Sequence, residues 1–281
     1  MVTKVAVVGV GTIGKSIALH VAQTNHEVTV VARHGQEGFN ALCSFVEKEA
    51  QKHRTQKSQD EILARISYVN NLREVPSNTE FFIEAITEDL TQKQRLFQQL
   101  ESLAENAVFC SNTSSLRIVD ISKLMQNPER MIGFHFFNPA HIIKLIEIIP
   151  SQKTSPKTVE KAKAFAEELG KTSLIAQDQP GFIVNRVLFA MINEAIGMLQ
   201  NGIRAEDIDV GMRLGANHPM GPLHLADFIG LDITLQVFEN LYEQTNRGEY
   251  KPQPLLIQKV KERNLGRKTG RGFFEYKGIN I

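Results

Sequence analysis

A glycine-rich turn near the N-terminus limits the possible folds of this chain more than any other segment. The apolar run at residues 5–8 is followed by Gly-Val-Gly-Thr-Ile-Gly at 9–14, a helical pattern at 15–23 and a second apolar run at 28–31. In a strand–turn–helix–strand unit, such glycines allow a tight turn, close approach of a pyrophosphate and close helix–strand packing, and the helix N-terminus offers free N–H groups. We therefore predict a dinucleotide site that is formed by Gly9, Gly11, Thr12, Ile13 and Gly14.

The end of the second strand departs from the usual form of this site. An acidic residue about 20 positions after the last glycine normally binds the adenosine ribose, but this chain has Ala32, Arg33 and His34 there. Arginine pairs well with a 2′-phosphate, which favours NADP. Arg33 could equally stack on the adenine or point into water, so the choice between NAD and NADP stays open.

The composition indicates a globular protein without an unusual partner. Hydrophobic residues make up 42% and charged residues 22% of 281 residues, and the net charge is +1. This charge gives no general attraction for nucleic acid, and no apolar run reaches the ~20 residues that span a bilayer. Cys43 and Cys110 have no metal-binding or redox spacing, so we expect no metal. The first apolar run is already used as a strand, which argues against a signal peptide and favours a cytoplasmic protein.

The order of the patterns predicts an α/β fold with two domains. Strand-like and helical segments alternate over residues 1–180, which is typical of a Rossmann-type parallel sheet with helices on both faces. An insertion at about 39–78 interrupts this order, and its first part resembles a polar helical hairpin. Residues 181–281 carry only helical patterns with long apolar faces. We expect this smaller all-α domain to form a homodimer.

Two apolar runs, at 131–137 and 142–149, indicate a hairpin that could carry a catalytic base. If its centre is residue 141, His135 lies opposite Glu147, at the ~5 Å spacing of cross-strand partners. A buried carboxylate needs a partner, and a histidine oriented by it can take up a proton near neutral pH. The spacing alone equally allows a core histidine and an unrelated edge-strand glutamate.

Hydroxyl side chains at 111–115 follow a strand at 107–110 and precede a helical stretch at 118–125. Ligands of open α/β sheets bind beyond the carboxyl ends of the strands, so one or two of these hydroxyls can face a substrate. Since Ser and Thr are also common helix N-caps, we expect at least one of them to cap the following helix.

Several longer motifs together resemble the L-3-hydroxyacyl-CoA dehydrogenase family. These motifs are SNTSSL at 111–116, GFHFFNP at 133–139, KLIE at 144–147, PGFIVNR at 180–186, LGANHPMGP at 214–222 and GRKTGRGF at 266–273. The resemblance covers essentially the whole chain. It implies a dinucleotide-binding domain, a helical dimerisation domain and NAD(P)-dependent interconversion of (S)-3-hydroxyacyl-CoA and 3-oxoacyl-CoA, with a short acyl chain.

The same resemblance implies roles for individual residues. His135 takes the proton of the C3 hydroxyl, Glu147 orients the imidazole, Ser114 and Asn185 hold the substrate oxygen, and Asn138 lies beside the nicotinamide and the reacting carbon. Ser114 and Asn138 are thus expected to contact both substrate and cofactor. Three charged residues also fall where the family contacts the cofactor, although each could be an ordinary surface charge: Glu88, Lys93 and Lys268.

Two alternatives remain beside this function. Five basic residues in the insertion could meet the phosphates of coenzyme A or the acidic surface of an acyl carrier protein, and the neighbouring acidic residues also allow a plain solvated face. They are Lys48, Lys52, His53, Arg54 and Lys57. The second alternative is a non-catalytic nucleotide-binding protein of the same fold. A dehydrogenase of the hydroxyisobutyrate type is disfavoured, because its catalytic lysine has no counterpart in residues 182–186.

Overall fold

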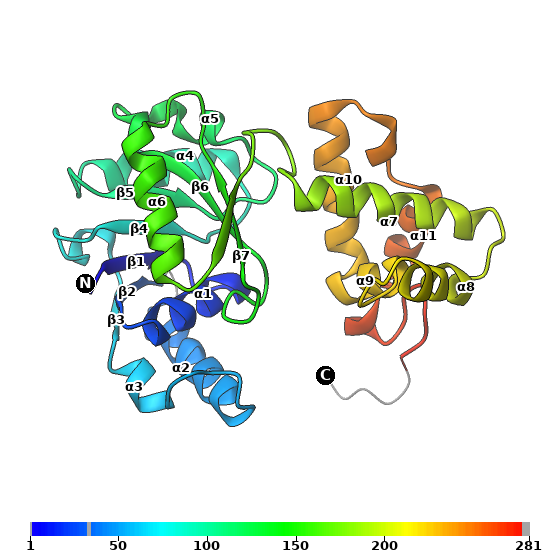
Figure 1. Ribbon diagram of the computed structural model, residues 1–281, viewed down its shortest axis with the longest axis horizontal. Coiled ribbons are helices and arrows are strands. Elements are labelled where there is room, and N and C mark those ends of the chain that lie inside the picture. Colours follow the sequence, from blue (N-terminus) through cyan, green and yellow to red (C-terminus); the bar gives the residue numbers. More distant parts are fainter. Residues whose placement is uncertain (1, 33–34, 277–281) are drawn as a thin grey trace. The chain divides into compact units, whose positions relative to one another are not determined.

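The computed structural model describes residues 2–32 and 35–276. The chain divides after Phe182 into two compact units (Figure 1).

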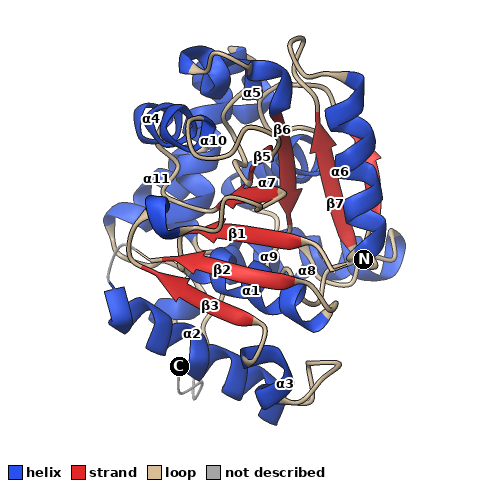
Figure 2. Cartoon of the chain, turned by 90° about the vertical axis from the view of Figure 1, so that its left-hand side faces the viewer, coloured by secondary structure: helices blue, strands red, loops and turns tan. Residues whose placement is uncertain are grey.

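The first unit is built on a mixed sheet of eight strands in the order β3-β2-β1-β4-β5-β6-β7-β8. Its strands are β1 (Lys4–Val8), β2 (Glu27–Val31), β3 (Ile66–Val69), β4 (Phe81–Glu84), β5 (Val108–Ser111), β6 (Met131–Phe136), β7 (Leu145–Ile149) and β8 (Thr172–Ile175). The neighbouring strands β3, β2, β1, β4, β5 and β6 are all parallel, and β7 runs antiparallel to β6. Figure 2 shows β1, β2 and β3 side by side at one end of the sheet. The switch of direction at β7 places the predicted hairpin inside the sheet.

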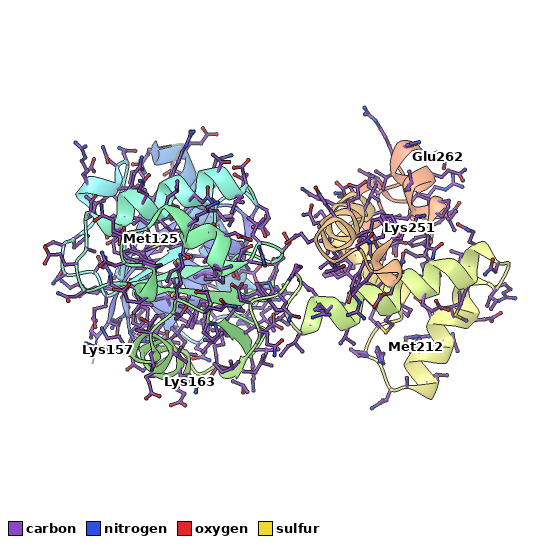
Figure 3. All side chains as sticks on the ribbon, turned by 90° about the horizontal axis from the view of Figure 1, so that it is seen from above. Met125, Lys157, Lys163, Met212, Lys251 and Glu262 are labelled. Atoms are coloured by element: carbon purple, nitrogen blue, oxygen red, sulfur yellow. The ribbon has the colours of Figure 1, made fainter. Side chains whose placement is uncertain are left out.

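Helices cover both faces of this sheet, as its alternating buried side chains require. Val5 and Val7 of β1 belong to the core that is shared with α1 (Thr12–Gln23), α2 (Gly35–Gln51), α3 (Gln59–Leu63) and α6 (Pro156–Glu168). Ala6 and Val8 belong to the opposite core, against α4 (Leu90–Glu101) and α5 (Ile118–Ile121). The exposed side chains of Lys157 and Lys163 lie at the outer surface of α6 (Figure 3). The predicted α/β class is therefore confirmed.

The insertion at 39–78 differs from the expected helical hairpin. Helix α2 begins earlier, at Gly35, and α3 has only five residues. The chain then forms β3, which extends the sheet beyond β2. In β3 only Ile66 is buried, so this edge strand lacks the apolar run by which the inner strands were recognised.

In the described residues of the second unit, the regular secondary structure is helical, apart from isolated β-bridges. Its elements are α7 (Val184–Gln200), α8 (Ala205–Val210), a π-helical turn (Gly211–Gly215), α9 (Pro222–Ile229), α10 (Leu231–Thr245) and α11 (Pro254–Lys261). Phe189, Ile196, Leu223 and Phe238 lie in its core. Among the described helices of the whole chain, none combines the length and the apolar character needed to cross a bilayer.

Candidate active site

The glycine turn has the backbone that a dinucleotide requires. Gly9 has a φ of 105°, and a Cβ there would lie 2.6 Å from the carbonyl oxygen of Ala85. A Cβ on Gly14 would lie 2.0 Å from the carbonyl oxygen of Gly9, so α1 packs too closely for any side chain. Gly11 is the N-cap of α1, with open space beside it and no side-chain cap. The N–H groups of the first helical turn, which includes Thr12 and Ile13, are thus left for an anionic ligand.

A cavity of about 430 Å³ adjoins this turn at the carboxyl ends of the central strands. Its lining residues are Val8, Gly9, Val31, Asn70, Asn71, Leu72, Ile86, Gln92, Arg95, Leu96 and Gln99. No carboxylate belongs to this set, and Arg95 is its one cationic residue. The predicted contact Arg33 lies outside the described residues. Asn70 and Asn71 escaped the sequence analysis because they follow β3, the strand that it missed.

His135 and Glu147 form a buried pair across β6 and β7. The strand register places them directly opposite each other, as predicted. Nδ1 of His135 lies 2.7 Å from Oε2 of Glu147, and the two residues are 4% and 0% exposed. Since the carboxylate accepts, Nδ1 carries the hydrogen and Nε2 is left with its lone pair. The alternative of an isolated core histidine is therefore wrong.

Ser114 lies at the free nitrogen of this imidazole. Its Oγ is 3.2 Å from Nε2 of His135, a geometry in which the hydroxyl donates to the ring. Ser114 follows β5 and His135 lies in β6, so the two meet at the carboxyl edge of neighbouring parallel strands. The chain from Ser114 through His135 to Glu147 is the arrangement of a hydroxyl-binding base with its orienting acid.

Glu88 holds the loop that carries Ser114. Its carboxylate accepts from the backbone N–H groups of Ser114 and Ser115, both at 2.9 Å, and from the hydroxyl of Thr113 at 2.6 Å. Burial acts to raise the pKa of Glu88, but Lys93 and these donors outweigh it and lower the pKa. Glu88 therefore remains a carboxylate that fixes the position of Ser114.

Lys93 joins Glu88 to a second carboxylate, Glu84, that the sequence analysis missed. Lys93 is 1% exposed, and its Nζ lies 2.5 Å from Oε1 of Glu84 and 3.2 Å from Oε2 of Glu88. Burial raises the pKa of Glu84 against the opposing effects of Lys93 and Ser111. The alternative that Lys93 is an ordinary surface charge is therefore wrong. Glu84 ends the apolar run of β4, the same signal that pointed to Glu147.

The helix after this loop is capped by a distant residue, contrary to the expectation for the hydroxyls at 111–115. The carboxylate of Asp178 accepts from the N–H groups of Ile118 at 2.6 Å and Val119 at 2.9 Å. The hydroxyl of Thr113 instead accepts from the N–H of Leu116 within the loop. The spacing of residues along the chain could not reveal this cap, because Asp178 follows β8 and is distant in sequence from the helix.

The remaining predicted residues belong to other segments of the chain. Asn138 is exposed, two positions after β6, and its peptide bond to Pro139 is cis. Asn185 is the second residue of α7 in the other unit. In that unit, Nζ of Lys268 lies 2.6 Å from both carboxylate oxygens of Asp232.

Part of the basic cluster in the insertion is neutralised. Glu49 pairs with Lys52 at 3.4 Å and with Arg54 at 3.6 Å, and Lys57 donates to the side chain of Asn25. Lys48 and His53 belong to the same segment. The carboxylate of Glu49 therefore offsets one of the positive charges of the cluster.

Comparison with known proteins gives this arrangement a family. The family model "3-hydroxyacyl-CoA dehydrogenase, NAD binding domain" matches residues 4–179, and the corresponding C-terminal domain model matches residues 181–276. The chain belongs to the 3-hydroxyacyl-CoA dehydrogenase family. A probable 3-hydroxybutyryl-CoA dehydrogenase of Bacillus subtilis is 40% identical over 281 residues, with 98% of each chain covered. A 3-hydroxybutyryl-CoA dehydrogenase of Clostridioides difficile is 38% identical, with 97% of this chain and 99% of the relative covered.

Solved structures agree with this assignment to the 3-hydroxyacyl-CoA dehydrogenase family. The crystal structure of (S)-3-hydroxybutyryl-CoA dehydrogenase from Ralstonia eutropha superposes with a TM-score of 0.90 at 37% identity, and covers 99% of this chain and 100% of that one. The family resemblance that the motifs indicated is thereby confirmed along the whole chain.

Proposed function

We propose that this member of the family interconverts (S)-3-hydroxyacyl-CoA and 3-oxoacyl-CoA with a nicotinamide dinucleotide. The observation that carries the proposal is the hydrogen-bonded chain of Ser114, His135 and Glu147 at the carboxyl edge of the sheet. A protein that only binds nucleotide has no chemical need for a buried carboxylate that orients an imidazole toward a hydroxyl. This argues against the non-catalytic alternative.

In the oxidative direction, Nε2 of His135 accepts the proton of the substrate C3 hydroxyl while the C3 hydride leaves. The bound dinucleotide supplies the hydride acceptor. Glu147 stabilises the resulting imidazolium, since its carboxylate already accepts from Nδ1 at 2.7 Å. Ser114 and Asn185 hold the substrate oxygen as the C–O bond becomes a carbonyl, and Asn138 orders the reacting edge of the cofactor.

The chain offers a fitting place for the cofactor. We propose that the glycine turn and the first turn of α1 bind its phosphates and that the 430 Å³ cavity takes its adenosine. Glu88 and Lys93 hold the Ser114 loop of this region, and the family resemblance adds Lys268 as a proposed cofactor contact. We further propose that NADP is accepted. Arg95 lines the cavity, none of the lining residues is a carboxylate, and Arg33 follows β2 in the sequence.

For the substrate, we propose a short acyl chain on coenzyme A. The relatives named above are 3-hydroxybutyryl-CoA dehydrogenases. An acidic carrier protein is less favoured, because Glu49 already pairs with Lys52 and Arg54 in the basic cluster. We also propose that the chain forms a homodimer through its helical unit.

The deciding experiment is reduction of acetoacetyl-CoA by the purified protein, run in parallel with NADH and NADPH. We expect turnover with acetoacetyl-CoA and a higher kcat/KM with NADPH than with NADH. A second series uses the acetoacetyl group on an acyl carrier protein. A strong preference for that series would indicate that the acyl carrier protein, and not coenzyme A, is the carrier. Lack of turnover in every series would contradict the proposed activity.

A further inference from the structure

A second polar chain lies inside the first unit, outside the proposed catalytic residues. Ser16 of α1, His141 of the β6–β7 connection and Glu49 of α2 are 1%, 8% and 6% exposed. Oγ of Ser16 lies 2.7 Å from Nδ1 of His141, and Nε2 of His141 lies 3.0 Å from Oε2 of Glu49. Three elements that are far apart in the sequence are thus joined through one imidazole.

The hydrogen bonds of this chain have one consistent direction. The backbone N–H of His141 donates to Oγ of Ser16 at 3.3 Å, which leaves the hydroxyl hydrogen to be donated to Nδ1. Nε2 then carries the ring hydrogen and donates to Glu49. Burial lowers the pKa of His141, and Glu49 opposes this effect. The neutral ring with its hydrogen on Nε2 therefore satisfies both partners.

The order serine–histidine–glutamate is also that of a nucleophilic triad, but this chain cannot act as one. Ser16 is 1% exposed and its Oγ is engaged by both the backbone and the ring of His141. An acyl group would have no access to the oxygen. The chain is a mechanical link between elements.

This hydrogen-bonded chain links two segments that lie at opposite ends of the proposed cofactor site. Ser16 lies two positions after Gly14, in the helix whose N-terminus faces the phosphates, and His141 lies three positions after Asn138. Lys171 also holds this connection, because its Nζ donates to the carbonyl oxygens of Ala140 at 2.5 Å and Ile143 at 2.6 Å. The connection is therefore held by polar contacts both from Ser16 and from Lys171.

We propose that His141 is a positioning residue that, through Ser16, sets the spacing between the phosphate-binding start of α1 and the loop that carries Asn138. This inference rests on the proposed function, since it assumes that the dinucleotide extends from α1 to Asn138. Glu49 contributes by holding the ring hydrogen on Nε2, so that Nδ1 accepts from Ser16. The predicted consequence is a loss of cofactor affinity when the Ser16–His141 bond is removed.

Substitutions at two positions separate this link from general stability. Ser16→Ala removes the hydroxyl, His141→Gln carries its amide toward Glu49 and loses the bond to Ser16, and His141→Asn keeps an acceptor near the position of Nδ1. We expect the Kd for NADPH or NADH, measured by cofactor fluorescence, to rise about five- to tenfold in S16A and H141Q, because one neutral hydrogen bond is lost. In H141N the Kd should stay within about twofold of the wild type.

His26→Asn is the matched control, because His26 is a buried histidine that precedes β2 and accepts from the N–H of Thr3. This variant should unfold at a lower temperature and bind the cofactor with unchanged Kd. If S16A and H141Q lower the melting temperature but leave the Kd unchanged, the positioning role is overturned. Should H141Q fail to fold, S16A alone decides. Absence of cofactor binding by the wild type would contradict the proposed function itself, and is thus distinguishable from failure of this inference.

Discussion

At His135, two neighbouring strands supply what proton transfer needs: the imidazole from β6 and its carboxylate partner from β7. Glu147 engages Nδ1, so Nε2 is the nitrogen that faces Ser114 and the proposed substrate hydroxyl. We predict that His135→Gln lowers kcat by about 10²–10⁴ and leaves cofactor binding intact, because the base is lost while the glycine turn is untouched. Steady-state kinetics and cofactor fluorescence measure the two effects. Unchanged turnover would remove His135 from the mechanism.

His20 gives a prediction for the acid limb of stability. Its Nε2 lies 3.0 Å from the carbonyl oxygen of Leu169, and burial, with Lys171 nearby, lowers its pKa to about 3. The unfolded chain takes up this proton near pH 6.5, so the free energy of unfolding falls as the pH drops from there toward 3. In His20→Gln this contribution is absent. Between about pH 7.5 and pH 5, the free energy of unfolding measured with urea should therefore fall by about 2 kcal/mol less in the variant than in the wild type.

The test compares the pH dependence of the free energy of unfolding in the two proteins, because other groups titrate in the same range in both. His20→Gln costs some stability at every pH through its altered packing, and that constant loss does not bear on the prediction. Parallel losses in the two proteins across the whole pH range would contradict the lowered pKa of His20.

At the scale of elements, the sequence predicted those parts that have a regular pattern of their own. The pleat fixes which residues of a hairpin are opposite once its centre is known, and this gave the pairing of His135 with Glu147. The edge strand β3 was missed because one buried side chain in four makes no recognisable run. Glu84 was missed although it ends an apolar run in the same way as Glu147 interrupts one. Its partner Lys93 lies on the following helix and could not be paired by a strand rule.

Helix α5 illustrates a contact that no local pattern contains. Asp178 follows β8 and caps α5 through the N–H groups of Ile118 and Val119. We predict that Asp178→Ala lowers the free energy of unfolding by about 1 kcal/mol, since two helix N–H groups lose their acceptor. Asp178→Asn keeps an acceptor and should lose less. Urea denaturation measures both variants, and equal stability of Asp178→Ala and the wild type would show that water replaces the cap at no cost.

At the scale of the whole molecule, the distribution of exposed apolar side chains argues for self-association. Of thirteen large apolar side chains that are exposed among the described residues, eight lie in the helical unit, although it holds only about a third of the chain. Leu214 is 79% and Phe228 is 56% exposed, a degree of exposure that costs free energy in a monomer and is typical of an interface.

We predict that light scattering after size exclusion gives twice the chain mass of 31.5 kDa for the wild type. The double variant Leu214→Glu/Phe228→Glu should shift toward the single-chain mass, because burying two carboxylates in a symmetric apolar interface is costly on both subunits. Leu124→Glu is the matched control, since Leu124 is 43% exposed in the other unit and its substitution should leave the dimer intact. A wild-type protein of single-chain mass would contradict the dimer. A dimer that survives the double variant would place the interface away from Leu214 and Phe228, so the two results separate the existence of the dimer from its location.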